Sequence, residues 1–508
     1  MKTLKENIVK IFARIVVYKT KKWGKKPLKT QNKIFNYLIQ KGKTTSFGQD
    51  HDFKEIFNHK DFVKNVPVRD YEGLRPYFER AVQGEKNVLW PGKPLYFAKT
   101  SGTTSGVKYI PVSKESMPTH VKGSRDAILH YINETGKAEF LNKKVIFLQG
   151  SPVLEEKNGI QTGRLSGIIA HHTPSYLKTN IMPRWETNCI EDWEEKVDEI
   201  SKETIKEDMS VIGGIPPWVQ MYFEKLKKLS GKKTIKKIFP NFNLFVYGGV
   251  NYEPYKQSFK KLIGKEIDSI EYYPASEGFF AYQDSQNKQG LLLLLNTGIY
   301  YEFIELDEMG KEDPKRLTIQ EVELNTSYVL IVSTSAGLWG YNTGDTVSFV
   351  SLSPRRIIVT GRYKHFISAF GEHVIGSEVE KSLKESIEKS ELIVKEFTVA
   401  PMIAPKEGLP FHEWWIEFEN NPSQEEIKEL EKRLDRKLQS LNAYYKDLIK
   451  GKVLKALEIV MVKKGGFNAY MKKEGKLGGQ NKLPRLSNER KIVSKMSSVT
   501  IKKTNQKW

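Results

Sequence analysis

The sequence predicts an α/β protein in which a large layered N-terminal domain, residues 1–363, precedes a smaller α+β C-terminal domain, residues 364–508. Three observations predict this class. A chain of 508 residues with 39% hydrophobic residues is long enough to bury more than one core. Residues 145–303 alternate short apolar runs with helical patterns, which is typical of layered α/β sheets. The pattern then changes character after Lys364.

The first 40 residues predict helices. Apolar side chains recur there at spacings of three and four, which places them on one helical face. This face consists of Ile8, Ile11, Phe12, Ile15 and Val16. We interpret it as the face that packs against the rest of the domain. The polar side of the helix is basic, and a helix that lies on a membrane surface is the alternative.

The middle of the chain predicts buried strands separated by helices. Residues 242–246 form one such strand, and a helix follows from Pro254 to about Ile263. Proline is tolerated at a helix start and glycine often ends a helix, so Pro254 opens this helix and Gly264 closes it. The aliphatic residues 291–295 predict another buried strand, because the run is far shorter than the roughly 20 residues of a membrane helix.

The C-terminal domain begins with a different pattern. Residues 414–418 alternate in the period of a strand, and Ser423 with Glu426 then matches a capping box, which marks a helix start. The helix that follows has one apolar face, formed by Ile427, Leu430, Leu434, Leu438 and Leu441. A strand followed by a capped helix agrees with a small α+β domain.

Several classes of protein are excluded by composition. Lys10 and Arg14 interrupt the apolar stretch that a signal peptide needs, so we expect a cytoplasmic protein without stable membrane insertion. A single cysteine, Cys189, excludes an intrachain disulfide and a cysteine-rich zinc site. The sequence contains neither a His-x-x-x-His pair with a glutamate partner nor a Gly-x-Ser-x-Gly elbow, which argues against the corresponding metalloenzymes and hydrolases.

The formal net charge of +21 raises the question of a nucleic-acid partner. The lysines, however, are scattered as short doublets such as Lys21-Lys22, Lys232-Lys233 and Lys502-Lys503, with no aromatic platform among them. Solvated faces explain them better, and a positive field would steer a substrate that carries carboxylate and triphosphate. We expect no specific nucleic-acid partner, and a monomer.

Residues 100–108, Thr-Ser-Gly-Thr-Thr-Ser-Gly-Val-Lys, are the most informative segment. The glycines let backbone amides approach phosphate oxygens, the hydroxyls donate hydrogen bonds, and Lys108 supplies a mobile positive charge. The segment is not a Walker A motif, because three residues rather than four separate Gly102 from Gly106, and Val107 precedes Lys108. A solvated loop is the plain alternative.

Three further segments favour the polyphosphate interpretation. Residues 273–278, Tyr-Pro-Ala-Ser-Glu-Gly, predict a turn with breaks at Pro274 and Gly278, where a ring, a hydroxyl and a carboxylate suit a base, a phosphate and Mg²⁺. Residues 337–345 end in Gly-Asp, whose carboxylate can accept hydrogen bonds from ribose, although Gly-Asp also forms ordinary turns. The third segment is residues 360–367, continued by residues 371–374 and 378–380.

In this order and spacing, the segments resemble the acyl-adenylate-forming superfamily. Within it the chain looks most like the auxin-responsive-promoter family, the acyl-acid amido synthetases that join hormones such as auxin or jasmonate to amino acids. The resemblance runs from about Thr44 to Leu486 and includes residues 108–112, 214–218, 247–250, 298–303 and 478–486. It implies a large domain of acyl-adenylate-forming type and a small mobile domain that swings about a hinge near Lys364.

The resemblance also implies chemistry: ATP and Mg²⁺ activate a carboxylic acid, and an amine, above all an amino acid, takes the acyl group. It assigns the polyphosphate to Thr100, Ser101, Gly102, Thr103 and Thr104, and we expect Lys108 beside them to be catalytic, as we do Glu277 and Lys482. Tyr273 would stack on adenine, and Asp345 and Arg362 would bind the ribose. Gly248 and Gly249 would allow the base and the acyl group to approach closely. Ser276 would contact the α-phosphate and Glu277 would bind Mg²⁺. Lys482 would reach the α-phosphate, with Lys476 as its competitor.

One position departs from the family pattern. The usual Leu-Trp-Arg-Tyr reads Leu-Trp-Gly-Tyr at residues 338–341, so an arginine contact is missing at Gly340. We expect altered acyl or acceptor recognition, because Glu277, Asp345 and Arg362 are all present; lost activity is the alternative. Two other functions stay open. One is a ligase that delivers the acyl group to a thiol such as coenzyme A, and the other is a catalytically inactive nucleotide- or nucleic-acid-binding protein.

Overall fold

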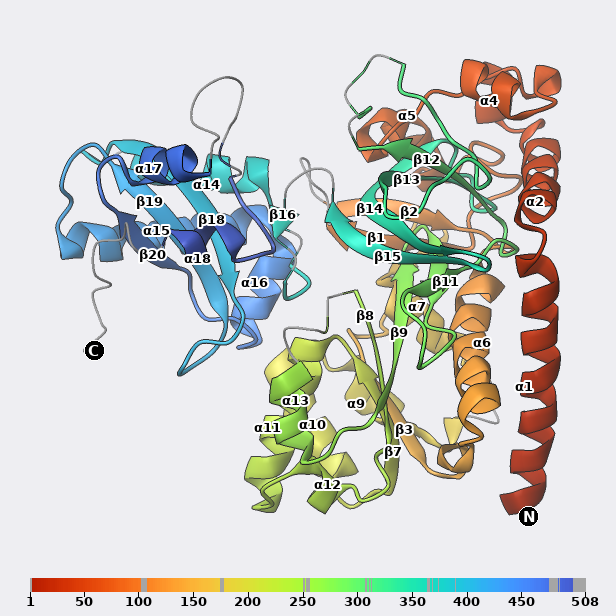
Figure 1. Ribbon diagram of the computed structural model, residues 1–508, viewed down its shortest axis with the longest axis horizontal. Helices are drawn as coiled ribbons and strands as arrows, with labels where there is room; N and C mark the ends of the chain where they lie inside the picture. Colours follow the sequence, from red (N-terminus) through yellow and green to blue (C-terminus); the bar gives the residue numbers. More distant parts are fainter. Residues whose placement is uncertain are drawn as a thin grey trace. The chain divides into compact units, whose positions relative to one another are not determined.

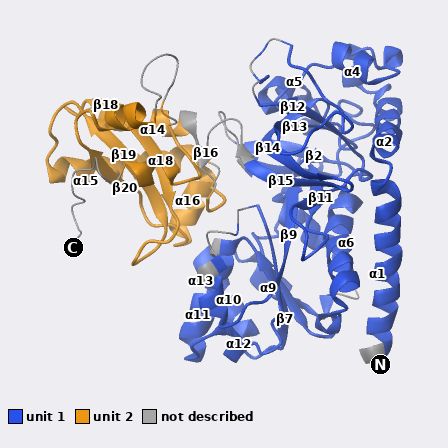
Figure 2. Cartoon of the chain, viewed as in Figure 1, with its two compact units in different colours: residues 1–100, 107–363 blue, residues 101–106, 364–508 orange. Residues whose placement is uncertain are grey.

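The chain divides into two compact units (Figure 2). Unit 1 is residues 1–100 and 107–363, and unit 2 is residues 364–508 with 101–106. The computed structural model describes the following residues: 2–101, 107–173, 178–249, 252, 256–306, 308–309, 311, 313–362, 366–367, 369–372, 374–388, 390–474, 483 and 485–496. The predicted hinge at Lys364 lies outside these residues, and movement of the C-terminal domain stays a prediction.

An eleven-stranded mixed sheet forms the centre of unit 1 (Figure 1). Its order is β12 (Ile299–Glu305), β13 (Ser327–Thr334), β14 (Tyr341–Leu352), β15 (Arg355–Arg362), β11 (Leu291–Leu293), β10 (Gly278–Tyr282), β9 (Asp268–Ala275), β8 (Leu244–Gly248), β7 (Met209–Gly214), β3 (Lys144–Leu148) and β6 (Ile181–Met182). The strands from β6 to β9 pair in parallel, and those from β9 to β12 pair antiparallel. Strand β9 therefore forms the border between the two halves.

Helices connect the parallel strands, as parallel pairing requires. Those between β6 and β9 are α9 (Trp185–Cys189), α10 (Trp193–Thr204), α11 (Pro216–Ser230), α12 (Ile235–Ile238) and α13 (Lys256–Ile263). The other helices of unit 1 are α1 (Lys2–Gly24), α2 (Pro27–Gly42), α3 (Ser46–Asp50), η1 (Phe53–Glu55), α4 (His59–Asn65), α5 (Tyr71–Val82), α6 (Met117–Thr135), η2 (Glu139–Asn142) and α7 (Leu165–His171). A second sheet has the order β2 (Val107–Val112), β1 (Tyr96–Ser101), β5 (Ile160–Gly163) and β4 (Glu155–Lys157).

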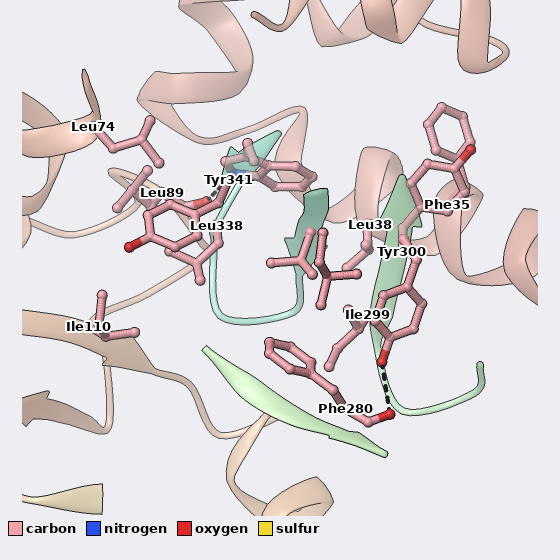
Figure 3. Packing of buried hydrophobic residues seen from close by; sticks show 14 of the residues in the cluster. Phe35, Leu38, Leu74, Leu89, Ile110, Phe280, Ile299, Tyr300, Leu338 and Tyr341 are labelled. Atoms are coloured by element: carbon pink, nitrogen blue, oxygen red, sulfur yellow. Dashed lines mark hydrogen bonds between the residues drawn. The ribbon is translucent and has the colours of Figure 1, made fainter. Parts of the chain in front are cut away.

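The core of unit 1 lies on both faces of the large sheet. Alternate residues of a strand point to opposite faces, and the predicted strand at residues 291–295 shows this directly. Leu291, Leu293 and Leu295 belong to one buried cluster, whereas Leu292 and Leu294 belong to another. Figure 3 shows part of the first cluster, to which Phe280, Ile299 and Leu38 of α2 belong. The predicted buried strand is confirmed for Leu291–Leu293, where β11 ends, and Leu294 and Leu295 are buried beyond its end.

The helix predicted before Gly264 is found as α13, which ends at Ile263. Gly264 closes it with a positive φ of 85°, and its N–H donates to the carbonyl of Lys260 at 2.9 Å. Pro254, the predicted first residue, lies outside the described residues. The strand predicted at residues 242–246 is found two residues later, as β8.

The predicted N-terminal helix is present, but the face that we expected to be buried is wrong. Helix α1 packs on α6 through a different row of residues, which are the buried Ala13, Val16, Val17 and Thr20. Of the five residues that we expected to be buried, only Val16 is; the others are exposed, namely Ile8, Ile11, Phe12 and Ile15. The helix carries two apolar stripes, and the smaller side chains of the second allow closer contact with α6 than isoleucine and phenylalanine would.

Unit 2 is an α+β unit. Its three-stranded sheet has the order β18 (Val394–Met402), β19 (Phe411–Phe418) and β20 (Glu458–Val462), and β16 (Phe366–Ile367) pairs with β17 (Val374–Ile375). Its helices are α14 (Gly376–Ile387), α15 (Gln424–Leu441), α16 (Ala443–Lys450), α17 (Gly466–Lys473) and α18 (Lys491–Lys495). The predicted capping box is present, because Ser423 and Glu426 satisfy each other's backbone N–H groups at the start of α15.

Candidate active site

Three parallel strands end at one edge of the large sheet. Strands β7, β8 and β9 end at Gly214, Gly248 and Ala275, and the carboxyl ends of parallel strands share an edge. Gly248 lies against the neighbouring backbone, because a Cβ there would come within 2.6 Å of the Tyr272 carbonyl oxygen. Gly249 has a φ of 77°, and no atom of the described residues lies within 4 Å of a Cβ placed there. Ligands of open α/β sheets bind at this kind of edge.

The predicted turn is a two-residue hairpin between β9 and β10. Strand β9 continues through Pro274 to Ala275, which pairs with Gly278, so the turn itself is Ser276 and Glu277. The break that we predicted at Pro274 is therefore wrong, because Pro274 still pairs with Phe279 of β10, and the pairing with β8 has already ended at Tyr272. The hairpin places a hydroxyl and a carboxylate, both partly exposed, at the carboxyl edge.

The structure joins two predicted nucleotide residues from distant parts of the chain. The Tyr273 hydroxyl donates to Oδ2 of Asp345 at 2.6 Å. Tyr273 is buried on β9, and its ring meets the Phe280 ring edge-on at a centroid distance of 5.1 Å. Asp345 lies on β14, where it pairs in register with Arg362 of β15. A side-chain hydrogen bond thus joins Tyr273 of β9 to Asp345 of β14.

Two residues that we did not predict shape the backbone before Asp345. The N–H of Gly344 donates to Oδ1 of Asn342 at 2.8 Å, and the N–H of Asp345 donates to the Thr343 hydroxyl at 3.2 Å. Gly344 has a φ of 81°, which glycine adopts without strain. Short polar side chains just before Gly-Asp favour such local hydrogen bonds, so the sequence itself contains the pattern that would have identified Asn342 and Thr343.

Lys108 lies on β2 next to an aromatic ring. Its Nζ is 5.3 Å from the centroid of the Tyr71 ring, a cation–π distance, and the Tyr71 hydroxyl accepts from the N–H of Tyr109 at 3.0 Å. Burial raises the pKa of the Tyr71 hydroxyl, so this ring stays neutral beside the ammonium. Thr100 is half-buried near the end of β1.

Several predicted site residues lie outside the described part of the chain. They are Gly102, Thr103, Thr104, Lys476 and Lys482, together with the side chains of Ser101 and Arg362. Among the residues that the structure does describe, no group of three or more His, Cys, Asp or Glu side chains is placed to hold a metal ion. The roles that the resemblance assigned to all of these residues stay predictions.

Gly340 occupies a crowded left-handed position. Its φ is 54°, and a Cβ would lie 3.1 Å from the Pro67 carbonyl oxygen and 3.3 Å from Nη2 of Arg316. Arg316 is buried, and the same Nη2 donates to Glu302 at 2.6 Å. The guanidinium beside position 340 therefore comes from another part of the chain, and an arginine at position 340 would crowd both Pro67 and Arg316.

We expect Gly340→Arg to lower the free energy of unfolding by about 2–4 kcal/mol, because overpacking and displacement of Arg316 add to the backbone strain. Gly340→Ala should cost about 1–2 kcal/mol. Gly231→Ala is the matched control, since Gly231 has a φ of 67° with no atom within 4 Å of a Cβ. Denaturant unfolding measures all three. A Gly340→Arg protein as stable as wild type would contradict this account.

Known proteins resemble the chain along most of its length. It is 22% identical to a jasmonoyl–L-amino acid synthetase of Nicotiana attenuata, with 87% of this chain and 88% of the relative covered. It is also 22% identical to the indole-3-acetic acid-amido synthetase GH3.3 of Arabidopsis thaliana, with 87% and 86% covered. Both similarities extend over the N-terminal and the C-terminal parts.

Solved structures share the fold. An acyl acid amido synthetase, AtGH3.15 in complex with 2,4-DB, superposes with a TM-score of 0.61 at 16% identity, covering 96% of each chain. A 2-hydroxyisobutyryl-CoA ligase, in complex with its acyl-adenylate and CoA, superposes with a TM-score of 0.57 at 12% identity, covering 92% of this chain and 91% of the ligase. The α/β fold of acyl-adenylate-forming type, with its C-terminal domain, is thus confirmed.

Family models match three successive segments. The GH3 family N-terminal domain matches residues 17–190 and 165–267, the central domain residues 292–362, and the C-terminal domain residues 377–491. These matches cover well over half of the chain and confirm the resemblance that the sequence motifs indicated. The chain belongs to the GH3 family.

Proposed function

We propose that this protein is a ligase that uses ATP and Mg²⁺ to adenylate a carboxylic acid and then transfers the acyl group to an amine, an amino acid above all, to form an amide. We place the reaction in the cytoplasm, where ATP is abundant, and propose that the protein acts as a monomer. The observation that carries the proposal is the hydrogen bond between Tyr273 and Asp345. Tyr273 lies on β9 shortly before the Ser276–Glu277 turn. In a GH3 chain this bond supports nucleotide binding at the carboxyl edge of the sheet.

The reaction has to give an unreactive carboxylate a leaving group. Attack of the carboxylate on the α-phosphate of ATP yields the acyl-adenylate and pyrophosphate, and charge on the polyphosphate must be neutralised as this happens. Residues 100–104 and Lys108 would hold the phosphates, and Ser276 would orient the α-phosphate. Asp345 and Arg362 would bind the ribose, and Tyr273 would hold the Asp345 carboxylate in place.

Glu277 is the residue that we assign to Mg²⁺. A single carboxylate suits this ion, which keeps several waters and shares phosphate oxygens rather than requiring a cluster of protein ligands. Bound Mg²⁺ would offset negative charge on the phosphates. The partial exposure of Glu277 at the tip of the hairpin agrees with a ligand that reaches out to a nucleotide-bound ion.

The relatives indicate the substrates. Their names give jasmonoyl and indole-3-acetic acid as acyl groups and amino acids as acceptors. We therefore propose a carboxylic acid with an apolar body as the acyl donor and an amino acid as the acceptor. In the second step the amine would attack the acyl carbonyl of the mixed anhydride, so that the C–N bond forms, AMP leaves and the amine loses a proton. Domain rotation would bring a new face of the small domain to the site.

Exchange of labelled pyrophosphate into ATP tests the proposal, because adenylation is reversible. A panel of aliphatic and aromatic acids should reveal exchange that requires both the acid and Mg²⁺. Product analysis with amino acids, other amines and coenzyme A then identifies the acceptor. If none of the acids supports pyrophosphate exchange, and the protein is shown to be folded, the inactive binding protein would be favoured. A thioester with coenzyme A and no amide would favour the thioester-forming ligase.

Tyr273→Phe should raise the KM for ATP about tenfold, because the variant keeps the ring but loses a hydrogen bond to a charged group. The acid-saturated kcat should change little. Tyr272→Phe is the control, since the neighbouring hydroxyl donates to the Ser124 carbonyl at 3.0 Å instead. Equal KM values for wild type and Tyr273→Phe would show that the Tyr273–Asp345 hydrogen bond does not contribute to ATP binding.

A further inference from the structure

Helix α1 carries a continuous apolar stripe on its outer side. Residues spaced by four, three, four and three lie on one helical face. The stripe, which we call the outer stripe, consists of Leu4 (65% exposed), Ile8 (58%), Ile11 (57%), Ile15 (45%) and Tyr18 (68%). At 1.5 Å per residue it is about 21 Å long.

The outer stripe is not needed to attach the helix. Ala13 and Val16, on the other side of α1, belong to the buried cluster that includes residues of α6 and the sheet. Figure 1 shows α6 on the inner side of α1. Phe12 borders the stripe and has a partner, because its ring lies 5.6 Å from the Arg125 guanidinium carbon. Single exposed apolar residues are ordinary, whereas a contiguous exposed patch marks an interaction surface.

The charges of α1 indicate what the stripe contacts. Among the described side chains of the helix, the exposed charged residues are all basic: Arg14, Lys19, Lys21, Lys22 and Lys5, whose Nζ donates to the Leu141 carbonyl at 3.1 Å. The single acidic residue of the helix, Glu6, accepts a hydrogen bond from the Asn142 amide at 2.8 Å. A second copy of α1 would bring like charges together along the seam, which disfavours self-association through this face. An anionic surface complements it.

We propose that the outer stripe of α1 docks this protein reversibly on the surface of an anionic phospholipid bilayer. The helix lies in the plane of the membrane, with the stripe at the boundary between headgroups and acyl chains and the flanking lysines and arginine against anionic headgroups. This is adsorption and not spanning. Among the helices in the described part of the chain, none is long and apolar enough to cross a membrane.

Vesicle flotation of the full chain tests the proposal. The protein should float with vesicles of phosphatidylcholine and phosphatidylglycerol, and should stay behind with vesicles of phosphatidylcholine alone. High salt should weaken the binding, because the Debye length shortens. The variant Ile8→Ser/Ile11→Ser/Ile15→Ser should lower the partition coefficient by more than about tenfold. Its melting temperature should stay close to that of wild type, because the three side chains are exposed.

Matched controls separate this face from general effects. Val153→Ser/Leu229→Ser/Leu324→Ser removes three apolar side chains of similar exposure, 49%, 50% and 48%, and should leave flotation unchanged. Lys21→Glu/Lys22→Glu should abolish the preference for anionic vesicles. Lys232→Glu/Lys233→Glu changes the net charge equally at another exposed doublet and should preserve that preference.

Three outcomes would overturn the proposal. Equal binding to neutral and anionic vesicles would remove the role of the basic border. Flotation that survives the triple isoleucine substitution would assign binding to another surface. Absence of flotation would exclude the bilayer; light scattering would then show either a dimer that the triple substitution converts to a monomer, which identifies a second copy as the occupant, or a monomer throughout.

Discussion

Glu277→Gln is expected to slow acid-dependent pyrophosphate exchange by roughly 10²- to 10³-fold, the scale of losing one preorganised charge contact at a reacting phosphate. Glutamine keeps the shape of the side chain but loses the charge that holds Mg²⁺. Because Glu277 lies in a two-residue turn and is partly exposed, the substitution should leave the fold intact. Exchange rates at several Mg²⁺ concentrations measure the effect, which should shrink as the ion approaches saturation.

Glu266→Gln is the matched control for this result. Glu266 precedes β9 at the opposite end of the strand and pairs with Lys260 at the surface, so its substitution should leave exchange unchanged. Near wild-type exchange in Glu277→Gln would show that Glu277 is only a turn residue. The metal assignment would then have to be abandoned.

Lys482→Ala is expected to separate the two half-reactions. If Lys482 reaches the α-phosphate only during adenylation, its loss should slow acyl-adenylate formation by roughly 10²- to 10³-fold. Transfer from acyl-adenylate supplied ready-made should continue at close to the wild-type rate. Single-turnover kinetics of each half-reaction measure the two effects separately.

Lys476→Ala distinguishes the two candidate lysines. It removes the same charge six residues earlier in the chain, so it should leave both half-reactions unchanged if Lys482 is the catalytic group. A selective loss of adenylation in Lys476→Ala would transfer the role to that residue. Equal losses in both steps for Lys482→Ala would indicate a structural role.

Local signals in the sequence predicted local structure well. The capping box at Ser423, the end of α13 at Gly264 and the turn before Gly278 each depend on residues that are close together in the chain. Backbone geometry and side-chain caps act over one turn of helix or one hairpin, so short sequence windows contain the information.

Contacts between distant residues were beyond such windows. Tyr273 and Asp345 were each predicted as nucleotide residues, but their hydrogen bond joins positions 72 residues apart and depends on the strand order of the sheet. The packing of Arg316 beside Gly340 was missed for the same reason. In α1 the pattern contained two apolar stripes, and only the position of α6 decides which of them is buried.

The two-residue connection between β9 and β10 restricts how the length of this chain can change during evolution. Tyr272 and Tyr273 are adjacent on β9, and their hydroxyls serve opposite faces of the sheet, one at Ser124 and the other at Asp345. A two-residue turn cannot lengthen or shorten without changing the pairing of β9 with β10. Gain or loss of one residue within β9 would exchange the faces of the two tyrosines. Indels should therefore accumulate elsewhere in GH3 chains, while this hairpin keeps a fixed length.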